Sequence, residues 1–319
     1  MKKSTITIIV PVFNVEDYVN TTLLSIKNQI SQADEVIVID DGSTDGSTKI
    51  INNYNQLHGW RIIQTHNQGL GLTRNLGRSI ARSDYIYFLD SDDIIKDDLI
   101  IRMREIIDRY NKPDMILFSG ESFEEKKTYR KKPNLKFTLK GEFFQKSKLI
   151  TMLAKRKETL PQTSRYITKK ELWFKNKLSF PEGIAEDEAV FFPLLTLSER
   201  TVVIKEIYFK YRLGRPGSIT LRPLNSKHAN DFLNRIVSSI EFMTLRYDLV
   251  KTNLSAWQYR LERKGLNYVS LCLKTRAPIA WITIFVLFYK TKSIGFPFKL
   301  FWRFLRHFFK ISINNLKNK

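Results

Sequence analysis

The sequence predicts an α/β protein with a doubly wound, mostly parallel sheet flanked by helices. Short β-branched apolar runs alternate with segments of helical periodicity, and the first runs end in polar turns rich in Gly and Asp. The chain has 319 residues, of which 43% are hydrophobic and 27% charged, a composition typical of folded proteins. This length exceeds one compact unit. We therefore expect a sheet domain over 1–222 and a helical, basic region over 223–319.

Residues 6–10 form the first apolar run, and we expect the strand to end at Pro11, which cannot donate to a ladder. Acidic residues then open a helix. Its apolar stripe repeats at 4-3-4 spacing over Val19, Leu23, Ile26 and Ile30.

Residues 35–39 form the second strand, which leads into an acidic turn over 40–47. Asp40 and Asp41 are placed to accept hydrogen bonds from a nucleobase or a ribose. An Asx-turn with a helix N-cap explains the same residues equally well.

Residues 61–64 form a third strand before a glycine-rich turn over 67–77. The glycines lack the G-x-G-x-x-G spacing of a dinucleotide site. A turn before a helix still offers free N–H groups to a phosphate. Arg74 either binds that diphosphate or is a solvated helix residue.

The fourth strand, residues 85–89, ends abruptly in Asp90, Asp92 and Asp93. Ligands of open α/β sheets bind at the carboxyl ends of strands. Oxygen-only ligands suit Mg²⁺ or Mn²⁺ shared with substrate phosphates. Without a cation, one of these carboxyls is expected to hold a proton. The alternative is an acidic turn that caps the next helix.

The alternation continues with a helix over 97–110 and a strand over 114–118. The basic segment 121–140 interrupts it, either as a flap over the site or as a surface insertion. Further helices are expected over 143–153 and 169–174. Residues 201–204 and 207–211 predict a closing hairpin.

A second acidic cluster precedes an apolar helix and contains Glu186 and Asp187. These acids either complement the dipole of the helix or supply a carboxylate base aimed at a hydroxyl. Further on, Tyr211, Arg212 and Arg215 form either a site for a phosphate-bearing ligand or a basic turn beside an edge strand.

The net charge of +21 implies a polyanionic partner. No Asp or Glu follows Glu262. One helical face of the tail is basic, and aromatic side chains such as Trp302 lie beside it. Such a helix fits the headgroup layer of an anionic membrane; packing on the protein core or in a dimer is the alternative. The basic positions are Lys299, Arg303, Arg306 and Lys310.

Nucleic acid is not an expected partner, because no binding motif for it is visible. Cys272 is the only cysteine, which fits a reducing compartment. The first residues show no signal-peptide pattern. We therefore expect a cytoplasmic protein, peripheral on the inner face of the cell membrane.

Taken in order, the motifs resemble those of the family 2 inverting glycosyltransferases, which have the GT-A fold. The likeness extends from residue 6 to about 222. It is carried by Pro11-Val12-Phe13-Asn14 with Tyr18, Asp40-Asp41-Gly42-Ser43-Thr44-Asp45, Asn67-Gln68-Gly69 through Arg74-Asn75, Asp90-Ser91-Asp92-Asp93, Glu186-Asp187, and Tyr211-Arg212 to Ser218-Ile219-Thr220.

The resemblance implies a nucleotide-binding half over about 1–120 and an acceptor half over about 121–222. By that likeness the nucleotide pocket involves Pro11, Phe13, Glu16, Asp40, Asp41, Asp90 and Arg74. Asp92, with Asp90, would hold Mn²⁺ or Mg²⁺ in a D-x-D arrangement. Asp187 would be the base, with Glu186 helping to bind the acceptor or to position the base, while Tyr211, Arg212 and Arg215 face the acceptor or diphosphate.

The implied reaction moves a sugar from a nucleotide-sugar, with UDP as the expected nucleotide, to a hydroxyl of a glycan or lipid-linked acceptor. It forms a β-glycosidic bond in surface polysaccharide synthesis. A sugar-nucleotide pyrophosphorylase and a catalytically inactive membrane-bound scaffold are the alternatives. The donor sugar, the acceptor, the linkage and the oligomeric state stay open.

Overall fold

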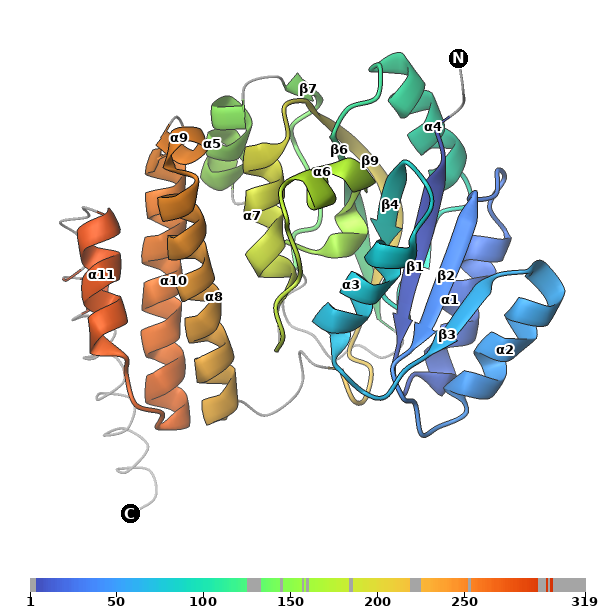
Figure 1. The fold of residues 1–319 in the computed structure, drawn as a ribbon, viewed down its shortest axis with the longest axis horizontal. Coiled ribbons are helices and arrows are strands. Elements are labelled where there is room, and N and C mark those ends of the chain that lie inside the picture. Colours follow the sequence, from blue (N-terminus) through green and yellow to red (C-terminus); the bar gives the residue numbers. More distant parts are fainter. Residues whose placement is uncertain are drawn as a thin grey trace. The chain divides into compact units, whose positions relative to one another are not determined.

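The computed structural model describes residues 4–124, 133–143, 146–156, 158, 161–183, 186–218, 225–251, 254–291, 297 and 299–300. The chain divides into two compact units, Met1–Leu221 and Arg222–Lys319. The first unit contains a mixed sheet with helices on its faces, and the second is helical (Figure 1).

Four parallel strands make the first half of the sheet, in the order β3-β2-β1-β4. They are β1 (Ile6–Val12), β2 (Glu35–Asp40), β3 (Arg61–Gln64) and β4 (Tyr85–Phe88). β1 and β4 are buried along their whole length, as expected for central strands covered on both faces.

The second half of the sheet is more antiparallel than the sequence predicts. β8 (Tyr166–Lys169) runs antiparallel between β4 and β6 (Met115–Glu124). β9 (Thr201–Leu213) is parallel to β6, and the short strands β5 (Ile94–Ile95) and β7 (Gly141–Phe143) pair antiparallel with it. The α/β class is confirmed.

Two expectations about strands are wrong. β1 continues through Pro11 to Val12. The backbone oxygen of Ile9 points toward β4 and accepts a hydrogen bond from the N–H of Leu89, just after that strand. Pro11, two residues on, faces that same side, where the ladder has already ended, so its missing N–H costs nothing.

The predicted hairpin over 201–211 is instead one continuous strand of 13 residues, β9. Its central residues, Lys205 and Glu206, are exposed. In the sequence, this polar pair between two apolar runs has the appearance of a turn. The pairing of β9 with β6 continues past these two residues, with register shifts around Ser119.

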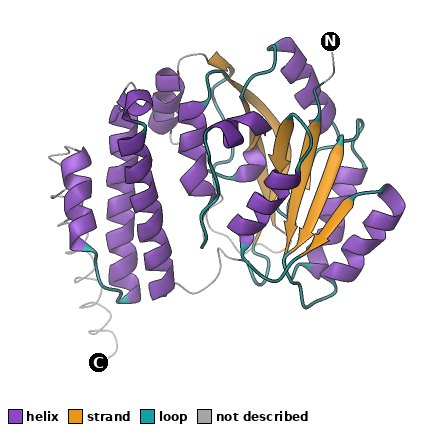
Figure 2. Cartoon of the chain, viewed as in Figure 1, coloured by secondary structure: helices purple, strands orange, loops and turns teal. Residues whose placement is uncertain are grey.

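Helices cover both faces of the sheet (Figure 2). They are α1 (Glu16–Lys27), α2 (Ser47–His58), α3 (Leu70–Ile80), α4 (Leu99–Arg109), α5 (Lys146–Arg156), the 3₁₀-helix η1 (Thr163–Arg165), α6 (Lys170–Lys175) and α7 (Asp187–Leu197). The predicted stripe of α1 is buried up to Ile26. Ile30 is exposed because the helix ends at Lys27.

The second unit confirms the expected helical C-terminal region. It contains α8 (Ser226–Leu245), α9 (Tyr247–Val250), α10 (Leu254–Thr275) and α11 (Trp281–Thr291). α10 packs against α8 and α11, and Trp257 stacks on Phe242 with ring centroids 5.3 Å apart. Within the described ranges, no helix has both the length and the apolar character needed to cross a membrane.

Trp302, Arg303, Arg306 and Lys310 lie outside the described residues. Lys299 is described, and its ammonium pairs with the buried carboxylate of Glu262. Lys299 thus finds an acidic partner on helix α10 of the same unit, although no acidic residue follows Glu262 in the sequence.

Candidate active site at the carboxyl ends of the strands

The parallel strands bring the loops after β1, β2 and β4 to one edge of the sheet. Side-chain to backbone bonds join the first two loops. The N–H of Thr44 donates to Asn14 Oδ1 at 2.8 Å, and the N–H of Glu16 donates to Asp45 Oδ2 at 3.0 Å. Pro11 is buried beneath these loops, whereas Phe13 and Glu16 are exposed.

Asp40 and Asp41 are both buried and organise the neighbouring turns. Asp40 Oδ1 accepts from the N–H of Ser43 at 2.9 Å, which is the Asx-turn alternative. Asp41 Oδ2 accepts from the N–H of Gly69 at 2.8 Å. Asp41 thus holds the glycine-rich turn, where Gly69 has a φ of 93° that suits glycine.

Arg74 is the central cation of the site and is buried to 2% exposure. One guanidinium nitrogen donates to Asp90 Oδ1 at 2.5 Å, and another pairs with Glu186 Oε1. The guanidinium also lies 5.5 Å from the ring centroid of Phe180. Neither sequence interpretation of Arg74 anticipates this bridge between the turn after β4 and the start of α7.

Asp187 is the first residue of α7 and is partly buried. Burial, together with the charges of Glu186, Glu188 and Asp90, raises its pKa to about 8, although Arg74 acts in the opposite direction. A carboxyl group that titrates near neutral pH is suited to general-base chemistry. Its place in the first turn of α7 also fits the helix-dipole alternative.

The turn after β4 holds two further carboxyls in unlike surroundings. Asp92 Oδ2 pairs with Nε of Arg215. Asp93 is fully buried, with Oδ1 accepting from the N–H of Arg212 at 2.9 Å and Oδ2 having no hydrogen-bond partner among the described residues. Burial and the neighbouring carboxylates raise the pKa of Asp93 well above its usual range. This shift favours the protonated form of Asp93, in line with the proton that the sequence predicts for this cluster.

Arg212 is buried between two aromatic rings. Its guanidinium lies 4.9 Å from the ring centroid of Tyr18 and 4.7 Å from that of Phe123. Its Nε donates to the backbone oxygen of Asp92 at 2.9 Å. Arg212 thus supports the acidic turn, while Tyr211, beside it on β9, is partly buried.

The donor set of the turn fits a hard divalent cation only as a shared site. Among the residues that the structure describes, no three His, Cys, Asp or Glu side chains gather as a metal cluster. Asp90 and Asp92 offer carboxylate oxygens, the type that Mg²⁺ and Mn²⁺ prefer, and substrate phosphates usually complete such a shell. A cation on Asp92 would replace the guanidinium of Arg215.

Tyr166 is a residue of this site that sequence analysis missed. It is 1% exposed, and its ring packs on Phe191 one turn after Asp187. In the part of the chain that the structure describes, its hydroxyl has no hydrogen-bond partner. Burial and the charge of Asp187 raise its pKa far above the usual range. No local pattern marks it, because β8 has the sequence Tyr-Ile-Thr-Lys, which contains neither an apolar run nor a cluster of charged residues.

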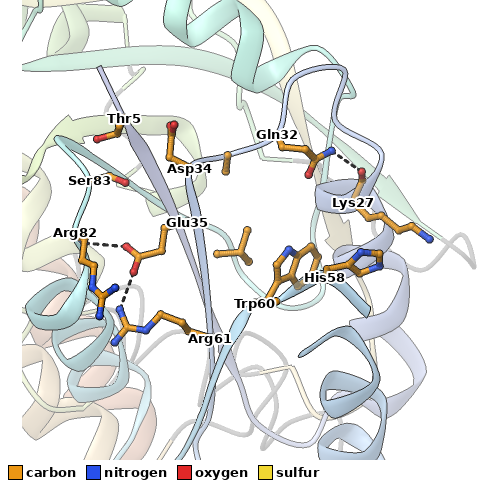
Figure 3. Close-up of a pocket in the computed structure, with 13 residues that line it drawn as sticks. Thr5, Lys27, Gln32, Asp34, Glu35, His58, Trp60, Arg61, Arg82 and Ser83 are labelled. Carbon is orange, nitrogen blue, oxygen red and sulfur yellow. Dashed lines mark hydrogen bonds and ion pairs between the residues drawn. The ribbon is translucent and has the colours of Figure 1, made fainter. Parts of the chain in front are cut away.

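A separate cavity of about 800 Å³ lies at the opposite, amino ends of the strands (Figure 3). Glu35 at the start of β2 lines it and accepts from Arg61 at 2.7 Å and from the N–H of Arg82 at 2.8 Å. None of the predicted site residues lines this cavity.

The fold is the GT-A fold of nucleotide-sugar-dependent glycosyltransferases. The crystal structure of residues 1–349 of Staphylococcus aureus TarS with UDP-GlcNAc superposes with a TM-score of 0.64 at 20% identity, covering 85% of this chain and 73% of that one. A mannosyltransferase of Pyrobaculum calidifontis, solved with GDP-Man and Mn²⁺, matches with a TM-score of 0.54 at 13% identity, covering 100% and 89%.

The chain belongs to glycosyl transferase family 2, whose family model matches residues 7–170. The glycosyltransferase GlyG of Streptococcus pneumoniae is 27% identical over 294 residues, covering 85% of this chain and 95% of GlyG. Three other bacterial relatives, including S. pneumoniae GlyA, are 37% to 47% identical, but the match covers at most 40% of their lengths.

Proposed function

We propose that this protein transfers a sugar from a UDP-sugar to a hydroxyl of a glycan or lipid-linked acceptor, with inversion at the anomeric carbon. The observation that carries the proposal is the Arg74 bridge. It joins Asp90 to Glu186 and so brings Asp187 beside the acidic strand end, although the two segments are about a hundred positions apart in the chain.

In the proposed step, Asp187 takes the proton of the acceptor hydroxyl. The acceptor oxygen forms a bond to the anomeric carbon, the bond from that carbon to the diphosphate breaks, and the nucleoside diphosphate leaves. Attack from the face opposite the leaving group converts an α-linked donor into a β-glycoside. Glu186, fixed by Arg74, orients the base.

The donor pocket is formed by the residues at the ends of β1 and β2, namely Pro11, Phe13, Glu16, Asp40 and Asp41. Asp92, with Asp90, would hold Mn²⁺ or Mg²⁺, which when bound neutralises charge on the departing diphosphate. Tyr211, Arg212 and Arg215 face the diphosphate or the acceptor. Arg215 would have to release Asp92 for a cation to bind that carboxylate, because the two side chains form an ion pair.

The relatives support the choice of substrates. TarS was crystallised with UDP and with UDP-GlcNAc, and a Bacillus spizizenii relative at 28% identity is a poly(ribitol-phosphate) beta-glucosyltransferase. A surface-polymer acceptor assembled on the inner face of the cell membrane fits a cytoplasmic, peripheral enzyme. The basic tail of the chain, with Lys299, Trp302, Arg303, Arg306 and Lys310, is the part expected near that membrane.

Isothermal titration with UDP in the presence of Mn²⁺, and then of EDTA, tests the donor site. We expect binding that depends on the metal. Asp187→Asn should keep this binding but lose turnover of the UDP-sugar by about 10²- to 10⁴-fold. Glu188→Gln, a change in the same helical turn, is the matched control and should retain turnover. Near-normal turnover in Asp187→Asn, or no UDP binding in either condition, contradicts the proposal.

A further inference from the structure

Helix α11 of the second unit presents a row of large apolar side chains to solvent. Ile282, Phe285 and Tyr289 are 83%, 77% and 74% exposed, and Val286 between them is 38% exposed. These four positions, here called the α11 stripe, follow the i, i+3, i+4, i+7 spacing of one helical face. The inward side of the helix, with Ile284 and Leu287, is buried, and α11 packs on α10.

An exposed apolar row of this kind marks an interaction surface rather than ordinary surface variation. Single exposed apolar residues do occur elsewhere in the described chain, for example Leu57 and Leu245. Leu57 has no second exposed large apolar residue beside it in α2, and Leu245 is eight residues from Val237, the other exposed apolar residue of α8. The stripe residues, in contrast, are continuous over two turns. Within the described residues of the second unit, this face of α11 is thus left uncovered.

The positive charge of the chain after Glu262 indicates which kind of partner binds the stripe. Twelve Lys and Arg residues and no Asp or Glu follow Glu262. Lys274 in the last turn of α10 and Arg276 in the segment between α10 and α11 are exposed. A second copy of the chain would bring like charges together at the stripe, which is unfavourable at low salt. An anionic surface offers the opposite charge.

The composition and length of α11 indicate that the anionic partner is a lipid surface. Phe and Tyr beside flanking cations are typical of helices that lie at the level of the lipid headgroups. With 11 residues, α11 is far shorter than the roughly 20 needed to cross the hydrocarbon core. It therefore suits an orientation parallel to the bilayer, with the stripe facing the acyl chains.

We propose that the α11 stripe is the surface by which this protein inserts into the headgroup layer of an anionic membrane. The inference deepens the proposed function, since it would bring the enzyme to a lipid-linked acceptor, but its test requires no turnover. It also differs from electrostatic attraction by the basic tail, because the stripe contributes apolar contacts that salt does not screen.

Vesicle flotation with full-length protein tests this. The probes are vesicles of phosphatidylglycerol and phosphatidylcholine, compared with phosphatidylcholine alone. We expect binding to the anionic vesicles and at least a tenfold loss of affinity for the double variant Ile282→Ser/Phe285→Ser, because two large apolar side chains no longer enter the bilayer. The matched control, Leu57→Ser/Leu245→Ser, removes equally exposed apolar side chains outside the stripe and should bind like the wild type.

A second readout reports insertion directly. In Phe285→Trp, lipids brominated on the acyl chains should quench the fluorescence gained over the wild type. Unchanged flotation of the stripe variant, or no added quenching, overturns the proposal and assigns binding to the cations alone. A wild-type dimer that becomes monomeric in the stripe variant, with flotation unchanged, also overturns it in favour of a second copy.

The two proposals fail separately. Protein that floats with vesicles but does not bind UDP would contradict the donor assignment alone. Protein that binds UDP and turns over donor but ignores vesicles would contradict only the role of the stripe.

Discussion

Asp187 shows how a single residue acquires its chemistry from its neighbours. Its sequence context, an acid at a helix start, is common and carries no information about ionisation. Burial and three nearby carboxylates raise its pKa to about 8, while Arg74 limits that rise. The residue is therefore protonated in much of the population at pH 7 and becomes available as a base at higher pH.

The pH dependence of transfer follows from this shift. A base must be deprotonated to act, so the rate should rise with pH along a limb centred near pH 8. Glu188→Gln removes one of the charges that raise the pKa of Asp187, and the limb should move to lower pH. A pH–rate profile of both proteins measures this, with Glu105→Gln on α4 as the control. A limb that does not move, or moves upward, would contradict the assignment.

Arg74 is a second residue whose role depends on its surroundings. Arg74→Met leaves the carboxylates of Asp90 and Glu186 without their buried partner. Breaking a buried pair in this way costs roughly 3–5 kcal/mol in the free energy of unfolding. Arg102→Met breaks only exposed pairs, with Glu105 and Asp98, and should cost no more than about 1 kcal/mol. Urea denaturation compares the two, and equal losses would refute the structural role of Arg74.

At the scale of elements, β6 and β9 show why a long strand was mistaken for a hairpin. Local sequence reports which side chains are polar, and Lys205 with Glu206 resembles a turn. The partner strand decides the outcome, because β6 supplies a ladder that continues past the polar pair. The sequence predicts the parallel strands of the first half more directly. β1, β2 and β4 are short apolar runs that are buried along most of their length.

The pairing of β6 with β9 brings Gly120 against the ring of Phe209. A Cβ added at Gly120 would lie 2.0 Å from that ring, which is fully buried and has no room to move. Gly120→Ala should therefore lower the free energy of unfolding by about 1–3 kcal/mol. Adding Phe209→Leu should restore part of the loss. If the double variant is less stable than the sum of both single changes predicts, the steric explanation fails.

For the whole molecule, ligand binding should stabilise the first unit. At about 100 times its dissociation constant, a ligand that binds only the folded state adds about 2.7 kcal/mol. For a unit of this size, that corresponds to a rise in Tm of about 5–10 °C. Differential scanning fluorimetry with UDP and Mn²⁺ measures it, and UDP with EDTA is the control. An equal shift with EDTA would contradict a metal-dependent donor site.

Much about this protein follows from sequence alone. The apolar runs predict the strands, the strand ends predict where ligands bind, and the ordered motifs predict the family. These features are local, since each depends on a short stretch of side chains and its period. The same reasoning correctly expects a helical, basic C-terminal region.

Only the tertiary structure decides which of these residues act on one another. Arg74 meets Asp90 and Glu186, Asp92 meets Arg215, and the hydroxyl of Tyr166 lies near Asp187. The partners come from separate elements, and no local period encodes their contact. Burial then sets the charge of each group, because the cost of removing a charge from water depends on everything packed around it. The exposed face of α11 is also identified only from the structure, which shows that α11 packs on α10 with its opposite side.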